Sequence, residues 1–186
     1  MSAKKPMLLV FAGPNGSGKS TITQYFEKVG EYTNADDVVA STGMDIKAAA
    51  KFVENKRYEA IAKGHDFSFE TVLSSEYNMN IIRKAKEEGY FVKCIYILTV
   101  NPDINVARIK TRVSLGGHDV PKDKIISRYK NSLGRIRELI DLCDILHVYD
   151  NSTEKPFRII RKHKNDITIF PNKIWNFEKI SNLLVR

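Results

Sequence analysis

The sequence has little cysteine and no apolar run long enough to cross a membrane. Its two cysteines, Cys94 and Cys143, lie inside apolar segments, without the C-x-x-C spacing of a zinc or redox motif. We therefore expect two buried, reduced thiols and no disulfide framework. The longest apolar segment, residues 91–100, is interrupted by Lys93 and falls short of the roughly 20 residues of a membrane helix.

The N-terminus, MSAKKP, has lysines but no apolar stretch behind them, so it does not read as a secretory signal. We expect a cytoplasmic protein without membrane association. Only ten Gly and six Pro occur in 186 residues, and 42% of residues are hydrophobic. These values exclude collagen-like and low-complexity chains, and they indicate a folded protein of about one domain.

Acidic residues are the minority among the charges. Asp and Glu number 22 against 30 Lys and Arg, which gives a net charge of +8. The last 36 residues hold eight basic and three acidic residues, whereas the first 150 hold 22 and 19. A basic surplus favours phosphate-bearing partners, which include nucleotides, nucleic acid and anionic surfaces.

Strand-like and helix-like segments alternate along most of the chain. The expected strands are 7–12, 32–35, 66–70, 90–98 and 145–149, and the expected helices are 19–29, 45–63, 75–88, 102–113 and 121–142. This order predicts an α/β three-layer sandwich, with a mostly parallel sheet and helices on both faces. The tail predicts paired strands at 157–160 and 167–170 and a helix over 171–184. We expect one domain, 1–186, with a core at 7–152 and a basic extension at 153–186.

Residues 13–20 read GPNGSGKS, which is the P-loop pattern G-x-x-x-x-G-K-[ST] between a strand and a helix. Its glycines permit the tight backbone that lets amides approach phosphates. Lys19 is expected to reach the β- and γ-phosphates, and Ser20 to ligate Mg²⁺. The predicted nucleotide-binding residues are Gly13, Pro14, Asn15, Gly16, Ser17, Gly18, Lys19, Ser20 and Thr21.

Several classes of P-loop protein lack their other motifs here. There is no D-x-x-G switch or N-K-x-D motif of a GTPase, because Asn172-Lys173 is followed by Ile-Trp. The segment 114–118, SLGGH, only partly matches the signature of a transport ATPase, and no apolar run ends in Asp-Glu as in mechanical ATPases. The short chain favours a small-molecule kinase.

Acidic residues follow three of the expected strands, at Asp36/Asp37, Glu70 and Asp150. The carboxyl ends of parallel strands gather at one edge of the sheet, where ligands bind. We expect Asp36 or Asp37 to be the base for an acceptor hydroxyl, with the other capping the next helix. Glu70, followed by Thr71, is expected to hold acceptor hydroxyls or Mg²⁺ through water, and a solvated strand end is the alternative.

Three arginines flank a glycine pair in the second half of the chain. Arg108 and Arg112 lie one helical turn apart and share a face, and Arg128 comes from the following helix. Two arginine-bearing helices around Gly116-Gly117 resemble a lid over phosphates, for which the arginine fork is well suited. His118 is either a polar turn residue or a catalytic one.

Together these stretches resemble the zeta toxin family of P-loop kinases, and in particular its short branch of predicted ABC-type ATPases. The matching stretches are AGPNGSGKST at 12–21, NADDVV at 34–39, FSFETVLSS at 67–75, RIKTRVSLGGHDVP at 108–121 and RY at 128–129. The resemblance spans about residues 7–152.

The resemblance implies an adenylate-kinase-like core that uses ATP or GTP with Mg²⁺. It also implies phosphorylation of a hydroxyl of UDP-N-acetylglucosamine and an antitoxin as a protein partner. By motif, Asp36 would activate the acceptor, Lys19 would bind phosphate, and Glu70 would contact the substrate. Arg112 and Arg128 would bind phosphates.

Two other functions stay open. A polynucleotide or nucleoside kinase would use the basic tail, with Phe157, Phe170, Trp175 and Phe177 stacking on bases, although such aromatics also fit a core. A nucleotide-binding module without turnover, paired with an antitoxin, is the other alternative.

Overall fold

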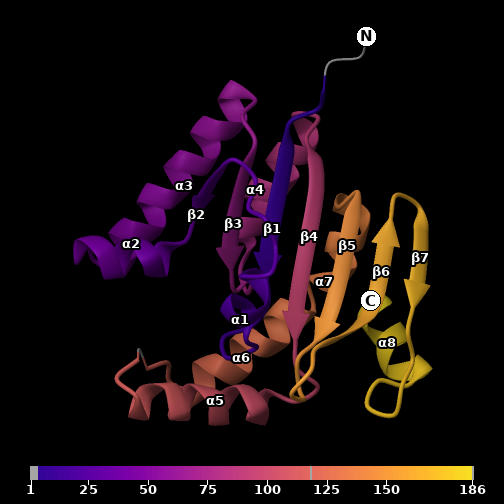
Figure 1. The fold of residues 1–186 in the computed structure, drawn as a ribbon. Helices are drawn as coiled ribbons and strands as arrows, with labels where there is room; N and C mark the ends of the chain where they lie inside the picture. Colours follow the sequence, from indigo (N-terminus) through magenta and orange to yellow (C-terminus); the bar gives the residue numbers. More distant parts are fainter. Residues whose placement is uncertain (1–3, 118, 186) are drawn as a thin grey trace.

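The computed structural model describes residues 4–117 and 119–185, and a seven-stranded sheet runs through it (Figure 1). The order across the sheet is β2-β3-β1-β4-β5-β6-β7. The first five strands in this order pair in parallel, and β6 and β7 pair antiparallel. The strands are β1 (Met7–Ala12), β2 (Glu31–Thr33), β3 (Phe67–Thr71), β4 (Phe91–Leu98), β5 (Ile145–Asp150), β6 (Phe157–His163) and β7 (Asp166–Ile169). The predicted mostly parallel α/β fold is confirmed.

The helices follow the predicted alternation with four differences. They are α1 (Lys19–Thr23), α2 (Ala35–Thr42), α3 (Ile46–Lys63), α4 (Glu76–Glu87), α5 (Pro102–Ser114), α6 (Lys122–Leu133), α7 (Ile136–Leu142) and α8 (Phe177–Leu184). The predictions of helices over 19–29 and 171–184 were too long, and that over 121–142 is wrong because the helix breaks near Gly134. Helix α2 was not predicted.

Helix α2 was missed because it has no apolar stripe, and none of its residues is buried. Its ends define it instead. The Asn34 side chain accepts a hydrogen bond from the Asp36 amide at the N-terminus, and Gly43 adopts a left-handed φ of 69° at the C-terminus. Such caps satisfy backbone groups that a short helix otherwise leaves without partners.

The two faces of the sheet are covered unequally. On one face, residues of α3, α4, α7 and α8 pack against alternate residues of the strands, which include Leu8, Val10, Tyr96, Leu146 and Ile160. On the other face, Leu9, Phe11, Ile95 and Ile97 pack against Ile22 of α1 and against Phe26 and Val29 of the segment that follows. The chain turns after Thr23 instead of continuing as a helix, so that this segment can lie on the sheet.

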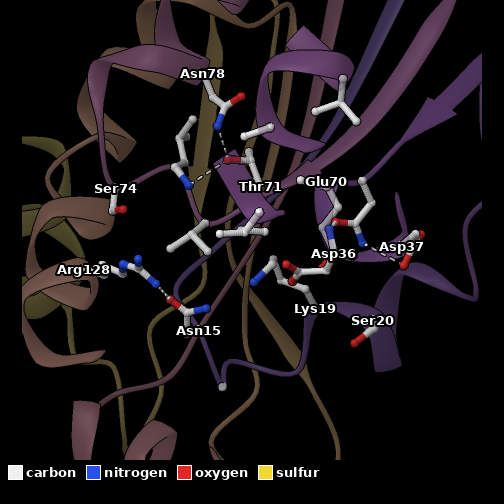
Figure 2. A pocket seen from close by; sticks show the side chains of 18 of the residues that line it. Asn15, Lys19, Ser20, Asp36, Asp37, Glu70, Thr71, Ser74, Asn78 and Arg128 are labelled. Carbon is white, nitrogen blue, oxygen red and sulfur yellow. Dashed lines mark hydrogen bonds between the residues drawn. The ribbon is translucent and has the colours of Figure 1, made fainter. Parts of the chain in front are cut away.

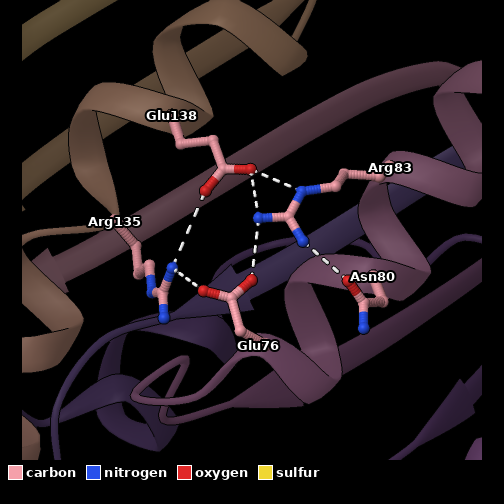
Figure 3. Close-up of polar contacts among 5 residues, drawn as sticks. All are labelled: Glu76, Asn80, Arg83, Arg135 and Glu138. Atoms are coloured by element: carbon pink, nitrogen blue, oxygen red, sulfur yellow. Dashed lines mark hydrogen bonds and ion pairs between the residues drawn. The ribbon is translucent and has the colours of Figure 1, made fainter.

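A polar network joins α4 to the start of α7 (Figure 3). Arg83 contacts Glu76 at 2.9 Å and Glu138 at 2.5 Å. Arg135 pairs with the same two carboxylates, and Asn80 accepts a hydrogen bond from Arg83. Two cations thus share two anions on the surface, which fixes how the two helices lie on the sheet.

Both cysteines are buried and free, and burial raises the pKa of the Cys94 thiol. Within residues 4–117 and 119–185, no helix combines the length and the apolar character needed to cross a membrane.

Candidate active site

The loop between β1 and α1 follows a path that only glycine accommodates at three positions. Gly13, Gly16 and Gly18 have φ values of 146°, 74° and 83°. A Cβ on Gly13 would lie 1.9 Å from the Ile97 carbonyl oxygen, and one on Gly18 would lie 2.2 Å from Asn151 Nδ2. The predicted P-loop is therefore tightly packed against the neighbouring strands, with its backbone free of side-chain bulk.

Side chains from distant parts of the chain support this loop. Asn105 of α5 donates a 2.6 Å hydrogen bond to the Asn15 carbonyl, and its own side-chain oxygen accepts one from Thr99. Asn151, which follows β5, donates to the Ser17 carbonyl at 2.8 Å. These contacts hold the loop in one conformation before any phosphate arrives.

Lys19 lies at the start of α1 and is 8% exposed. Its ammonium group donates a 3.2 Å hydrogen bond to the Pro14 carbonyl. Burial lowers the pKa of Lys19, and the carboxylates of Glu70 and Asp36 oppose that shift. A buried cation with a single described hydrogen-bond partner is suited to receive phosphate oxygens.

Arginines of α5 and α6 approach the same loop. Arg128 donates from Nη1 to the Asn15 side-chain oxygen at 3.3 Å. The Nη1 atom of Arg108 is buried and has no hydrogen-bond partner among the described residues. A buried, unpaired guanidinium nitrogen costs free energy, and a phosphate oxygen would satisfy it. Val106, Ile109 and Ile125 pack α5 against α6, which holds both arginine-bearing helices over the loop.

Carboxylates face Lys19 from two other elements. Asp36 and Asp37 lie in the first turn of α2, and Glu70 lies near the end of β3. The Asp37 carboxylate accepts a 3.2 Å hydrogen bond from Asn34, whereas no described residue donates a hydrogen bond to the Asp36 carboxylate. Neither aspartate side chain caps the helix, as one was expected to, because Asn34 does so. Burial raises the pKa of Glu70, Lys19 opposes that rise, and Asp37 and Asp36 add to it.

A buried arginine braces this acidic side. Arg57 of α3 donates to the Thr33 hydroxyl at 2.9 Å, to the Thr33 carbonyl at 3.3 Å and to the Asn78 side-chain oxygen at 2.7 Å. Its guanidinium also lies 4.2 Å from the centre of the Phe69 ring. Asn78 in turn donates to the Thr71 hydroxyl, which accepts from the Leu73 amide. The brace joins β2, β3, α3 and α4.

The phosphate loop and the acidic side form two walls of one cleft (Figure 2), with a volume of about 710 Å³. In Figure 2 the Lys19 side chain lies between Asn15 and the carboxylates of Glu70 and Asp36. Most of the residues predicted from the sequence line this cleft: Asn15, Gly16, Gly18, Lys19, Ser20, Thr21, Asp36, Asp37, Glu70, Thr71, Arg108, Arg112 and Arg128.

The remaining predicted residues are placed differently. Gly13, Pro14 and Ser17 shape the loop from below without lining the cleft, and Ser17 is fully buried. His118 lies outside the described residues. Asp150, the third acidic strand end, is turned into the core, where it accepts hydrogen bonds from Ser152 and from the Trp175 indole at 2.8 Å.

Sequence reasoning missed Arg57 and the asparagines that support the cleft. Asn34 alone carried a local signal, because it precedes a helix start with two acidic residues. Arg57 lies in a lysine-rich helix, and Asn78, Asn105 and Asn151 belong to no motif. Their partners lie between six and 134 residues away in the sequence.

Comparisons with known proteins agree with this geometry. The zeta toxin family model matches residues 37–161, which is 125 of the 186 residues. The match begins after the P-loop, so the loop and the family match are separate observations. A Haemophilus influenzae protein described as "Uncharacterized protein" is 32% identical over 128 residues, which are 65% of this chain and 91% of that protein.

Two solved structures share the fold. The crystal structure of AvrRxo1-ORF1:-ORF2 with ATP has a TM-score of 0.73 at 14% identity, covering 98% of this chain. This chain spans 64% of that one. The PezAT chromosomal toxin-antitoxin system of Streptococcus pneumoniae has a TM-score of 0.57 at 19% identity, over 81% of this chain and 70% of that one.

The sheet order, the glycine loop and the lysine at the start of α1 define the class of the protein, which is that of the P-loop NTPase fold. Within that class, the chain belongs to the zeta toxin family, because the family model covers more than half of its residues.

Proposed function

We propose that this chain is a Mg²⁺-dependent kinase that transfers the γ-phosphate of ATP or GTP to a hydroxyl of a small molecule. The observation that carries the proposal is the two-walled cleft. Cations of the P-loop, α5 and α6 form one wall, and the carboxylates of α2 and β3 form the other. Phosphoryl transfer needs this combination of charge neutralisation and acceptor positioning.

The phosphate wall fits a nucleoside triphosphate. Gly16 and Gly18 of its loop line the cleft, and the unpaired Arg108 nitrogen lacks an acceptor that a phosphate would supply. Ser20 is exposed in the cleft, and its hydroxyl would hold Mg²⁺, which neutralises charge on the β- and γ-phosphates when bound. That a structure of the same fold, AvrRxo1-ORF1:-ORF2, is described as being with ATP supports a nucleotide as the ligand.

The acidic wall supports a role for Asp36 as the acceptor base. Its carboxylate carries no described hydrogen bond and acts electrostatically on Lys19 across the cleft. Asp36 would take the proton of the acceptor hydroxyl as that oxygen bonds to the γ-phosphorus, while the bond from phosphorus to the β–γ bridging oxygen breaks. Lys19 and the arginines would stabilise the charge that develops on the transferred group and the leaving diphosphate.

Glu70 and Thr71 would orient the acceptor, and Asp37, held by Asn34, would complete that wall. Arg112 would contact phosphates beside Arg128. We propose a UDP-N-acetyl amino sugar as the acceptor, on the strength of the family membership. We also propose an antitoxin as protein partner, since PezAT is a toxin-antitoxin system by its description.

The test is incubation of the full chain with Mg-ATP and separate panels of UDP-sugars, nucleosides and oligonucleotides, read by mass spectrometry for an added phosphate. We expect a phosphorylated UDP-sugar. Lys19→Ala should abolish the product, and Asp36→Asn should retain nucleotide binding while transfer falls about 10²- to 10⁴-fold. A product in the oligonucleotide panel alone would replace this proposal by a polynucleotide kinase, and full activity of Asp36→Asn would exclude Asp36 as the base.

A further inference from the structure

One face of the sheet lacks helical cover over its last three strands. Figure 1 shows no helix in front of β5, β6 and β7, and the packing on this side of the described chain centres on β1, β4 and α1. The register of the strands shows which side chains of β4, β5, β6 and β7 project from this side of the sheet. We call the open face the surface formed by Lys93, His147, Tyr149, Arg158, Arg161, His163 and Thr168.

The open face is basic and almost free of acidic residues. Lys93, Arg158, Arg161 and His163 are its cationic or ionisable members, and none forms an ion pair within residues 4–117 and 119–185. Asp166, opposite His163 at the outer strand, is the one carboxylate that β5, β6 and β7 place on this side.

The other basic residues of the open face all act electrostatically on His147. Burial lowers the pKa of His147 to about 4, and Arg158, Lys93, Arg161 and His163 lower it further in that order. All four of these residues belong to the open face. Cations gathered on one surface repel one another, which costs stability that an anionic partner would restore.

Aromatic rings lie between the cations. His147 and Tyr149 project from the same side of β5, with ring centres 6.2 Å apart in an edge-to-face arrangement. Arg161 pairs with His147 across the strands, and Arg158 pairs with Tyr149. Each ring therefore has a guanidinium-bearing residue on the neighbouring strand, about 5 Å away along the hydrogen-bonding direction.

We propose that the open face binds single-stranded nucleic acid. A flat sheet that interleaves rings with cations can stack bases on the rings and neutralise phosphates with the cations. None of the open-face residues lines the nucleotide cleft, so the two sites are separate. Two of the eight Lys and Arg residues among the last 36, Arg158 and Arg161, thereby gain a role outside catalysis.

Other occupants fit this surface less well. A second copy of the chain would bring like charges together. An acidic amphipathic helix would need apolar side chains for its own apolar face, and the open face offers polar and ring side chains instead. The test below can still detect such a partner, because it includes an acidic peptide as a competitor.

The test measures fluorescence anisotropy of a labelled 12-nucleotide single-stranded RNA with the full chain, under saturating Mg-ATP so that the cleft is filled. Lys93→Gln/Arg161→Gln removes two charges from the open face. Lys110→Gln/Lys130→Gln removes two exposed charges from α5 and α6 and is the matched control. His147→Thr removes a ring but keeps a residue that suits a strand.

We expect the open-face double variant to bind at least tenfold more weakly than the control variant. Its log–log salt slope should be smaller by about 1.4, since about 0.7 counterions are released per phosphate contact on a single strand. His147→Thr should bind more weakly with an unchanged slope, because stacking releases no counterions. DNA of the same sequence should respond to the variants in the same way.

Three results would overturn the proposal: no RNA binding under saturating Mg-ATP, equal binding by the open-face and control variants, or displacement of RNA by poly-glutamate at equal charge concentration. The last would assign the face to an acidic protein. Each readout is independent of phosphoryl transfer, so the kinase proposal can fail while this one stands.

Discussion

Arg57 joins α3 to the end of β2 through a 2.9 Å hydrogen bond from its Nε to the Thr33 hydroxyl. All its described hydrogen-bond partners are neutral, and only 3% of the residue is exposed. Burial lowers the pKa of Arg57 to about 10. The fold thus holds a buried cation that is not bonded to a described carboxylate. This cation lies next to the acidic wall of the cleft, where β2 leads into Asp36.

The Arg57 brace should matter more for activity than for stability. In Arg57→Met, loss of the buried charge offsets loss of the hydrogen bonds, so the unfolding free energy should change by less than about 2 kcal/mol. The acidic wall of the cleft should become less rigid. Because the acceptor would then be positioned less accurately, kcat/KM for the acceptor should fall by roughly tenfold to a hundredfold. Nucleotide affinity should stay at the wild-type value, which isothermal titration calorimetry can measure.

Arg57→Lys separates charge from geometry. Lysine keeps the charge but cannot direct donors to Thr33 and Asn78 at once, so it should leave transfer impaired. Full recovery in Arg57→Lys would show that the positive charge alone is what the wall requires. A parallel loss of nucleotide affinity in both variants would point to general damage to the cleft.

A methyl group at Gly18 should disturb the P-loop beyond the cost of its backbone angle. Its Cβ would lie 2.2 Å from Asn151 Nδ2, which displaces the contact with the Ser17 carbonyl. Gly64→Ala is the matched control, because Gly64 has a φ of 64° and open space around it. That control should cost about 1–2 kcal/mol of stability, while Gly18→Ala should cost more and also weaken ATP binding. Equal effects of the two changes on both measurements would contradict the packing role of Gly18.

Glu70 should lower the stability of the fold at neutral pH while supporting phosphoryl transfer. A carboxyl with a raised pKa in the folded chain binds protons more readily there than when unfolded, so it reduces stability as the pH rises above its ordinary range. Glu70→Gln should therefore raise Tm at pH 7 and lose that advantage in acid. Transfer by the wild type should fall as the pH drops through the raised pKa, and Glu70→Gln should abolish this acid limb at a lower maximum. A pH profile of kcat/KM that keeps its limb in the variant would assign the limb to another group.

The Arg83–Glu76–Arg135–Glu138 network should contribute acid-sensitive stability. Hydrogen bonds from Arg83, then Arg135, lower the pKa of Glu76. A carboxyl with a lowered folded pKa stabilises the fold above its unfolded pKa, and that contribution disappears as the pH falls through the folded value. Glu76→Gln should thus lower Tm at pH 7 and have little effect well below the ordinary glutamate pKa of about 4.3.

Glu59→Gln provides a comparison for that network, because Lys63, at 2.6 Å on the surface of α3, is the one described residue that forms an ion pair with Glu59. A single exposed pair contributes little, so its effect at pH 7 should be the smaller of the two. If Glu59→Gln lowered Tm as much as Glu76→Gln, the second arginine of the network would add nothing.

The sequence by itself determined the features that depend on short segments. The glycine spacing at 13–18 and Lys19 specified the phosphate loop, because that loop needs backbone angles that only certain residues adopt. The alternation of apolar segments specified the parallel sheet, and motif spacing indicated Asp36, Glu70 and the arginines. Helix α2 was not predicted because only its end caps indicate it. The break at Gly134 was not predicted because residues 121–142 were read as one long helix.

Only the tertiary structure decided how those segments work together. Hydrogen bonds from Asn105 and Asn151 to the P-loop, the Arg57 brace and the inward turn of Asp150 all join residues whose partners depend on strand order. The same packing places α8 beside α7 on the covered face, leaving Lys93 of β4 and the arginines of β6 on the open one. The sequence determines which charged side chains are present. The order in which the strands pair determines which neighbours each charge has, and therefore whether that charge finds a partner.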